Sequence, residues 1–300
     1  MNSIRSLLAG IVDYAGLFPP AGLEMDAAVR NYAEYRASDD CDLLGRFVVP
    51  AARLDEFTAA ARGLLERGAG STPWHLSVLA GDDVPAAREA VLDFNCSHWS
   101  DSELGHAVCD AVEIHAHRER DISAAVREFP ASFRLFFEIA LAPDPAFLLS
   151  AVARNSASAK IRTGGITEAS FPSASRIVRF IAICCGLDVP FKATAGLHHA
   201  LRSTYPLTYE PQTECAMMFG YINLFLAAAY IRKGMQETEA REVLEEQSLD
   251  AFSFSDDGMS WRGRDLTASD LRATRSDLAL SFGSCSFREP VDEARALHLL

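Results

Sequence analysis

The chain has 300 residues, of which 49% are hydrophobic and 23% are charged, a balance typical of globular proteins. This length is ordinary for a single α/β barrel and is sufficient to bury a sizeable core. The formal net charge of −13 argues against a nucleic-acid or an anionic-membrane partner, because each of these needs a basic face.

The cysteines and the longest apolar stretch indicate a reduced protein of the cytoplasm. The seven cysteines include no Cys-x-x-Cys pair, and the neighbours Cys184 and Cys185 lie in an apolar helical pattern that disfavours bridging. The apolar run near the N-terminus is interrupted by Asp13 and is not expected to be a signal peptide. Residues 216–231 are fewer than the roughly 18 that a membrane span needs and include Asn223, so we expect a buried helix there.

Strand-like and helix-like segments alternate along the first half of the chain. A first strand is expected at residues 8–12, closed by Asp13 and Tyr14, and a helix is expected at 26–36. The next three units pair a strand with a helix in the same way, at 43–49 and 54–66, 74–79 and 84–93, and 108–115 and 121–128. A fifth strand at 133–141 precedes a helix that begins after Asp144 and ends at Arg154.

The second half continues this alternation and then becomes less regular. The sixth strand ends at Lys160 and precedes a helix at 173–185, and the seventh strand ends at Lys192. A long loop at 198–212 and an apolar helix ending at Arg232 follow. Residues 252–262 have the pattern of a β-hairpin with an Asp-Gly turn, a short helix begins at Thr267, and an eighth strand is expected at 278–282.

Eight strand-helix units of this spacing predict an α/β fold, a (β/α)8 TIM barrel with a small β-hairpin insertion before the closing strand. We expect one domain over residues 1–300, since no low-complexity linker divides the chain. A doubly wound open sheet is the alternative, but no Gly-x-Gly-x-x-Gly follows the first strand.

Lysine is rare in this chain and is placed inside strands. Of the 28 basic residues only Lys160, Lys192 and Lys233 are lysines, so arginine provides almost all of the basic surface. Only lysine can lose its proton near neutral pH and act as a nucleophile or a base. The two lysines within predicted strands therefore indicate chemistry that a guanidinium cannot perform.

In a TIM barrel the carboxyl ends of the strands carry the site. Side chains alternate along a strand, so Lys160 shares a face with Arg162, and Glu113 shares a face with His115. Inward charges must pair across neighbouring strands, and Glu138 is the nearest expected partner of Lys160. Repulsion between two neighbouring lysines, together with burial, would lower a lysine pKa towards the range for attack on a carbonyl.

Other polar residues at the strand ends are candidates for binding. The turn of Thr163, Gly164 and Gly165 either closes a strand or binds an anion through its amides. Further candidates for substrate binding follow the other strands, namely Asp13, His115, Thr194, His198, His199, Gly283 and Ser284. Cys285 comes directly after Ser284, where a packed thiol is a simpler expectation than a reactive one.

Two short segments carry a resemblance to a known family. Lys160-Ile161-Arg162-Thr163-Gly164-Gly165 and Lys192-Ala193-Thr194-Ala195-Gly196 resemble the two lysine motifs of the class I deoxyribose-phosphate aldolase family. This resemblance implies that Lys160 forms the Schiff base and that Lys192 is its electrostatic partner. It also implies a phosphate-binding role for Gly283 and Ser284. Arg162 replaces a small residue of the family pattern.

The sequence therefore predicts a Schiff-base-forming, aldolase-like lyase that acts on a small anionic carbonyl compound without a cofactor. Lys160 would attack the carbonyl, Lys192 would tune it, Glu138 or Glu113 would shuttle protons, and Arg162 would hold the anion. A metal-dependent hydrolase or lyase using His115 and His117 is the first alternative. A non-catalytic small-ligand-binding barrel is the second. A homo-oligomer is as compatible with the sequence as a monomer.

Overall fold

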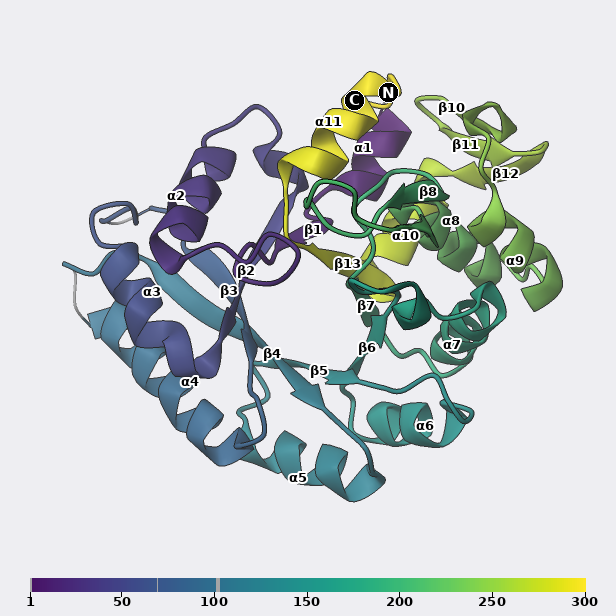
Figure 1. Cartoon of the computed structure of the whole chain (residues 1–300). Coiled ribbons are helices and arrows are strands. Elements are labelled where there is room, and N and C mark those ends of the chain that lie inside the picture. Colours follow the sequence, from purple (N-terminus) through teal and green to yellow (C-terminus); the bar gives the residue numbers. More distant parts are fainter. Residues whose placement is uncertain (1, 69, 101–102) are drawn as a thin grey trace.

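The protein is a closed barrel of eight parallel strands, which confirms the predicted TIM-barrel fold (Figure 1). The computed structural model describes residues 2–68, 70–100 and 103–300. Around the barrel the strands follow the order β1-β13-β7-β6-β5-β4-β3-β2. Their bounds are β1 Val12–Tyr14, β2 Leu44–Pro50, β3 Trp74–Leu79, β4 Ala107–His115, β5 Arg134–Glu138, β6 Ser158–Arg162, β7 Phe191–Thr194 and β13 Ala279–Ser284.

Helices surround the barrel and bury its outer face (Figure 1). They are α1 Asn2–Leu8, α2 Met25–Arg36, α3 Leu54–Ala60, α4 Val84–Ser100, α5 Glu119–Glu128, α6 Ala146–Arg154, α7 Ala174–Gly186, α8 Tyr221–Arg232, α9 Glu237–Glu245, α10 Ala268–Asp277 and α11 Arg288–Ala296. The predicted helices in the first half of the barrel are present, although α3 ends earlier and α4 ends later than the sequence pattern indicated. One hydrophobic cluster extends from Ile4 to Leu299 and joins strands with helices.

Helix α8 explains the longest apolar stretch of the sequence. All of its residues from Tyr221 to Ile231 are buried, because α7, α9 and α10 pack around it. The expected helix begins later than predicted, since Cys215–Met218 forms a strand before it. Across the described part of the chain, every helix is too short or too polar to cross a membrane.

The predicted first strand at residues 8–12 is wrong. Residues Asn2–Leu8 form α1, whose Ile4, Leu7 and Leu8 lie fully in the core at helical spacing. Gly10, with a φ of +57°, lies between this helix and β1. The apolar run was therefore a helix followed by a short strand, two elements that periodicity alone does not separate.

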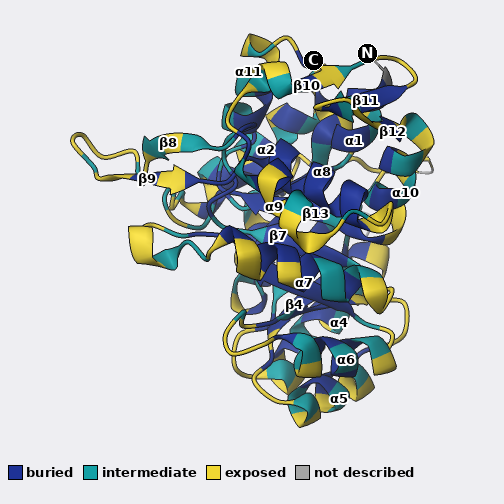
Figure 2. Cartoon of the chain, turned by 90° about the vertical axis from the view of Figure 1, so that its right-hand side faces the viewer, coloured by how far each residue is buried: buried dark blue, intermediate teal, exposed yellow. Residues whose placement is uncertain are grey.

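The predicted loop at 198–212 contains part of an antiparallel hairpin that the sequence analysis missed. Its strands are β8 Ser203–Pro206 and β9 Cys215–Met218, and the hairpin projects from one end of the barrel (Figure 2). Leu207, Ala216 and Met218 form a small core of their own. This satellite cluster gives the hairpin a reason to fold outside the main core.

The insertion before the closing strand is a three-stranded sheet rather than a simple hairpin. The predicted pair is present as β10 Phe252–Phe254 and β11 Gly258–Trp261, and β12 Arg264–Thr267 adds a third strand. Thr267 then caps α10 in a reciprocal capping box with Asp270, as expected for a helix that begins there. Helices α9 and α11 were not predicted, because polar residues dominate their sequences.

Candidate functional site

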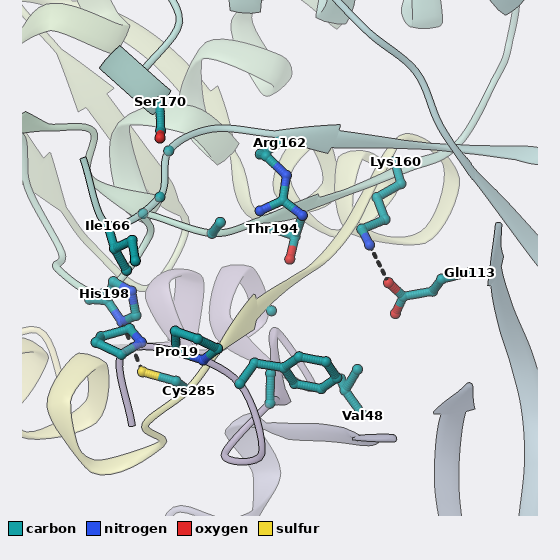
Figure 3. A pocket seen from close by; sticks show the side chains of 18 of the residues that line it. Pro19, Val48, Glu113, Lys160, Arg162, Ile166, Ser170, Thr194, His198 and Cys285 are labelled. Atoms are coloured by element: carbon teal, nitrogen blue, oxygen red, sulfur yellow. Dashed lines mark hydrogen bonds and ion pairs between the residues drawn. The ribbon is translucent and has the colours of Figure 1, made fainter. Parts of the chain in front are cut away.

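A cavity of about 380 Å³ lies at the carboxyl ends of the barrel strands (Figure 3). Its lining includes Lys160 and Arg162 from β6, Thr194 from β7, and Gly283 from β13. These residues come from three adjacent strands, so the closure of the barrel builds the cavity.

The strand register brings the two strand lysines side by side. Lys160 of β6 is the direct partner of Lys192 of β7, and on the other side it is the partner of Glu138 of β5. Residues in register on neighbouring parallel strands project to the same face. Both lysines consequently point into the barrel, where their side chains are only 5% and 1% exposed.

Five charged side chains alternate in sign across the barrel, and we call them the ion-pair chain: Asp13, Lys192, Glu113, Lys160 and Glu138. The Lys192 amine lies 2.5 Å from the Asp13 carboxylate and 2.7 Å from Glu113. The Lys160 amine lies 2.7 Å from Glu113 and 2.8 Å from Glu138. The expected pairing of Lys160 with Glu138 is therefore present.

Glu113 is the centre of the ion-pair chain. One of its oxygens accepts hydrogen bonds from Lys192 and from the Ser77 hydroxyl at 2.7 and 2.6 Å, and the other pairs with Lys160. Burial alone would raise the pKa of Glu113, but the charges of the two lysines lower it well below its usual value. Glu113 therefore remains a carboxylate and joins the two amines.

Lys192, near the inner end of the ion-pair chain, is held as an ammonium. Burial would lower its pKa, but the neighbouring charges of Asp13 and Glu113 outweigh that effect and raise it. Repulsion between the two lysines does not prevail at Lys192, because a carboxylate lies between them. Its amine also lies 5.3 Å from the centre of the Phe136 ring, a further contact that favours the cation.

Asp13 is fixed from three sides and does not line the cavity. Its carboxylate accepts hydrogen bonds from the Arg46 backbone N–H and the Ser281 hydroxyl, both at 2.8 Å, in addition to Lys192. A Cβ atom on Gly45 would lie 2.5 Å from Asp13 Oδ1, so glycine is needed there for close approach. The candidate binding residue Asp13 is thus the anchor of Lys192.

The outer end of the ion-pair chain, at Glu138, reaches solvent. Glu138 is 13% exposed and contacts Arg162 at 3.3 Å and His115 at 3.6 Å. Burial would raise the pKa of Glu138, but the neighbouring Lys160, Arg162 and His115 outweigh it, and the pKa is lowered. Arg162 and His115 are about half exposed, and Arg162 lines both the main cavity and a neighbouring hollow beside Glu138.

The predicted turn after β6 shapes the cavity wall. Thr163 is fully buried and its hydroxyl donates to the Ala195 carbonyl oxygen at 2.6 Å, which ties this turn to the one after β7. A Cβ on Gly196, whose φ is +73°, would lie 2.8 Å from Gly164 Cα. Gly164 and Gly165 line the cavity, whereas Thr163 holds the two turns together.

The remaining candidates divide between the cavity and its surroundings. Thr194, Gly283 and His198 line the cavity. Ser284 lies behind His198, with 3.4 Å between its hydroxyl and His198 Nδ1. His199 lies outside the cavity, where it stacks on Tyr205 at 3.4 Å.

The structure also identifies residues that the sequence analysis left out. Ser77 and Ser281 are buried hydroxyls in apolar strands, a pattern that could have indicated inward hydrogen bonds. Cys285, for which the sequence favoured a packed thiol, lines the cavity beside His198.

The histidines do not assemble a metal site within the described residues. His115 and His117 both border the outer hollow, but no group of three or more His, Cys, Asp or Glu side chains in the described ranges is arranged to hold an ion. His115 contacts the Glu138 carboxylate instead.

Comparison with known proteins does not assign the chain to a family. No family model matches the sequence, and no curated protein is significantly similar to it.

Proposed function

We propose that this protein is a Schiff-base-forming lyase, similar to class I aldolases, that acts on a small anionic carbonyl compound. The observation that carries the proposal is the Lys160 amine at the cavity wall, within 2.8 Å of two carboxylates. An amine that attacks a carbonyl needs a nearby group to take its proton and to return it. Glu138 and Glu113 are within reach of this proton.

The covalent step balances with these groups alone. The Lys160 ammonium gives a proton to Glu138, and the free amine adds to the carbonyl carbon of the substrate. Two protons move in turn from the nitrogen to the former carbonyl oxygen, the second of them returned to the nitrogen by Glu138, which lies 2.8 Å from it, and water leaves. The product is a protonated imine on Lys160, which can accept the electrons released when a neighbouring C–C bond breaks.

Glu138 is better suited than Glu113 to carry this proton. Glu138 is 13% exposed and lies at the outer end of the ion-pair chain, whereas Glu113 is 3% exposed and is shared by both lysines. Protonation of Glu113 would leave two ammonium groups without the charge between them. Glu113 and Lys192 therefore position Lys160, and Glu138 exchanges protons with it.

An anionic substrate fits the charges at the cavity. Arg162 and Lys160 of β6 both line the cavity. A protein with a net charge of −13 has no general attraction for anions, so these local cations would select them. A volume of about 380 Å³ limits the substrate to a small molecule.

Turnover in D2O tests this function. We would incubate the protein with a panel of small aldehydes, ketoacids and β-hydroxy carbonyl anions and follow α-proton exchange and C–C cleavage by NMR. Wild type and Lys233→Arg, which changes an exposed lysine, should give the same rates. Lys160→Arg should lose all exchange and cleavage, because a guanidinium forms no imine. Equal rates in Lys160→Arg and wild type would exclude the proposed chemistry.

A further inference from the structure

The cavity has a second polar group at its other side, away from Lys160. Figure 3 shows Cys285 and His198 there, with Arg162 and Thr194 between them and the lysine. Cys285 follows β13 directly, and its sulfur lies 3.8 Å from His198 Nδ1. Cys285 is only 4% exposed, yet it lines the cavity, so the cavity is its route to small molecules.

Two further residues build the surroundings of this thiol. The Tyr209 hydroxyl, from the loop between β8 and β9, lies 3.5 Å from the sulfur and donates a hydrogen bond to Glu289 at 3.0 Å. Glu289 of α11 also lies 3.5 Å from His198 Nδ1. A carboxylate beside the imidazole favours its protonated form, and an imidazolium beside sulfur favours the thiolate.

The charge states of these groups agree with that geometry. Burial would raise the pKa of Cys285, but the contacts with His198 and Tyr209 outweigh it and lower the pKa. The pKa of Glu289 is also lowered, since His198 outweighs the burial of that carboxylate.

We propose that Cys285 is a reactive modification site, at which hydroperoxides and other small electrophiles enter the cavity and react with the sulfur. With hydrogen peroxide, the thiolate attacks one oxygen, an S–O bond forms and the O–O bond breaks. The sulfur is oxidised by two electrons to a sulfenic acid, and the leaving hydroxide takes a proton from His198 to become water. The added group then occupies part of the cavity. This inference does not depend on lysine chemistry.

The other cysteines provide internal comparisons. Cys109 and Cys184 are buried, and burial raises their pKa well above the usual value. Cys41, Cys96 and Cys215 are exposed to solvent. The size of the reagent should therefore distinguish Cys285 from the exposed cysteines. A small reagent should reach Cys285, and a bulky one should reach only the exposed thiols.

Alkylation of the folded protein tests the site. Cys185 is only partly buried, so it is replaced together with the exposed thiols. In a variant with Cys41→Ser, Cys96→Ser, Cys185→Ser and Cys215→Ser, iodoacetamide should add one group, which peptide mapping should place on Cys285. The sulfur displaces iodide, so an S–C bond forms as the C–I bond breaks. Labelling of Cys285 should be at least about tenfold faster than labelling of Cys109, since the reaction follows the thiolate fraction and access. Equal rates at these two thiols would overturn the proposal.

A matched pair of variants tests the role of the imidazolium. His198→Gln should slow alkylation of Cys285 about tenfold or more, because it removes the imidazolium 3.8 Å from the sulfur. His199→Gln should leave the rate within about twofold, because His199 stacks on Tyr205 and reaches the cluster only through Glu289, at 4.0 Å. Hydrogen peroxide followed by dimedone should add mass at Cys285 in the protein with His199→Gln and much less in the protein with His198→Gln. No difference between the two variants would overturn the proposal.

A pH profile of wild type needs no variant at the site. The titratable groups that face the sulfur are His198 after β7, Tyr209 between β8 and β9, and Tyr14 of β1, with Glu289 behind the first two. Alkylation of Cys285 should rise less steeply with pH than alkylation of an exposed thiol, because contact with His198 outweighs burial and lowers the pKa of the Cys285 thiol. An exposed thiol should instead react about tenfold faster per pH unit below its own pKa of about 8.5. A Cys285 profile with that same steep rise would contradict the proposal.

Discussion

Glu113→Gln removes the one negative charge that lies between the two lysine ammonium groups. The amide has nearly the same shape as the carboxylate, so packing changes little. Lys192 keeps Asp13 and Lys160 keeps Glu138, but each loses a partner at 2.7 Å. The two cations then face each other across a neutral group, inside a barrel where their side chains are 1% and 5% exposed.

The expected loss of stability is about 3–5 kcal/mol, the usual cost of leaving a buried charge without its partner. Part of this loss should disappear at alkaline pH, because one lysine with a lowered folded-state pKa can release its proton. When the folded state lowers the pKa of a lysine, the loss of stability is complete at low pH. It becomes smaller as the pH rises towards about 10.4, the pKa of lysine in the unfolded chain.

Urea unfolding at pH 7 and pH 9.5 measures both effects. Glu119→Gln is a matched control, because Glu119 pairs with Arg154 at 2.7 Å while half exposed, where such a pair contributes about 0–1 kcal/mol. A Glu113→Gln variant as stable as the Glu119→Gln variant would refute the assignment of Glu113 as the centre of the ion-pair chain.

Two further predictions concern stability at low pH and the inner end of the ion-pair chain, at Asp13. The pKa values of Glu113 and Glu138 are lowered in the folded protein, so their stabilising contribution is complete above the ordinary value of 4.5 and is lost as pH falls below it. Urea unfolding between pH 3 and 7 should show this decline, with a weaker decline in Glu113→Gln; parallel slopes would contradict it. Gly45→Ala should displace Asp13 and lower stability by about 1–3 kcal/mol, because the new Cβ would lie 2.5 Å from Asp13 Oδ1. Gly186→Ala, where a Cβ meets nothing within 4 Å, is the control, and equal melting temperatures of the two variants would contradict this prediction.

The sequence was sufficient for the barrel and for the outer half of the ion-pair chain. Apolar strands alternating with helices predict the fold, and adjacent strands in register place Glu138 beside Lys160. These inferences need only local periodicity and the order of strands. The prediction of one strand at residues 8–12 is wrong because helix α1 and strand β1 follow each other within one hydrophobic run.

The inner half of the ion-pair chain, Asp13 and Lys192, depends on barrel closure. Asp13 and Lys192 are 179 residues apart, and they meet because β13 lies between β1 and β7 in the closed barrel. The contact between Cys285 and His198 spans 87 residues and depends on the shape of two loops. Strand alternation does not specify loop geometry, so these partners could not be found from the sequence.

Borohydride trapping is the most direct test of imine formation at Lys160. Reduction converts an imine to a stable amine and leaves an ion-paired lysine unchanged. Wild type would be incubated with small aldehydes or ketoacids and reductant, then digested and analysed by mass spectrometry. We expect one added mass on the peptide that contains Lys160, and none in Lys160→Arg. No trapped mass with any carbonyl compound would contradict the claim, and a mass on Lys192 alone would reverse the roles of the two lysines.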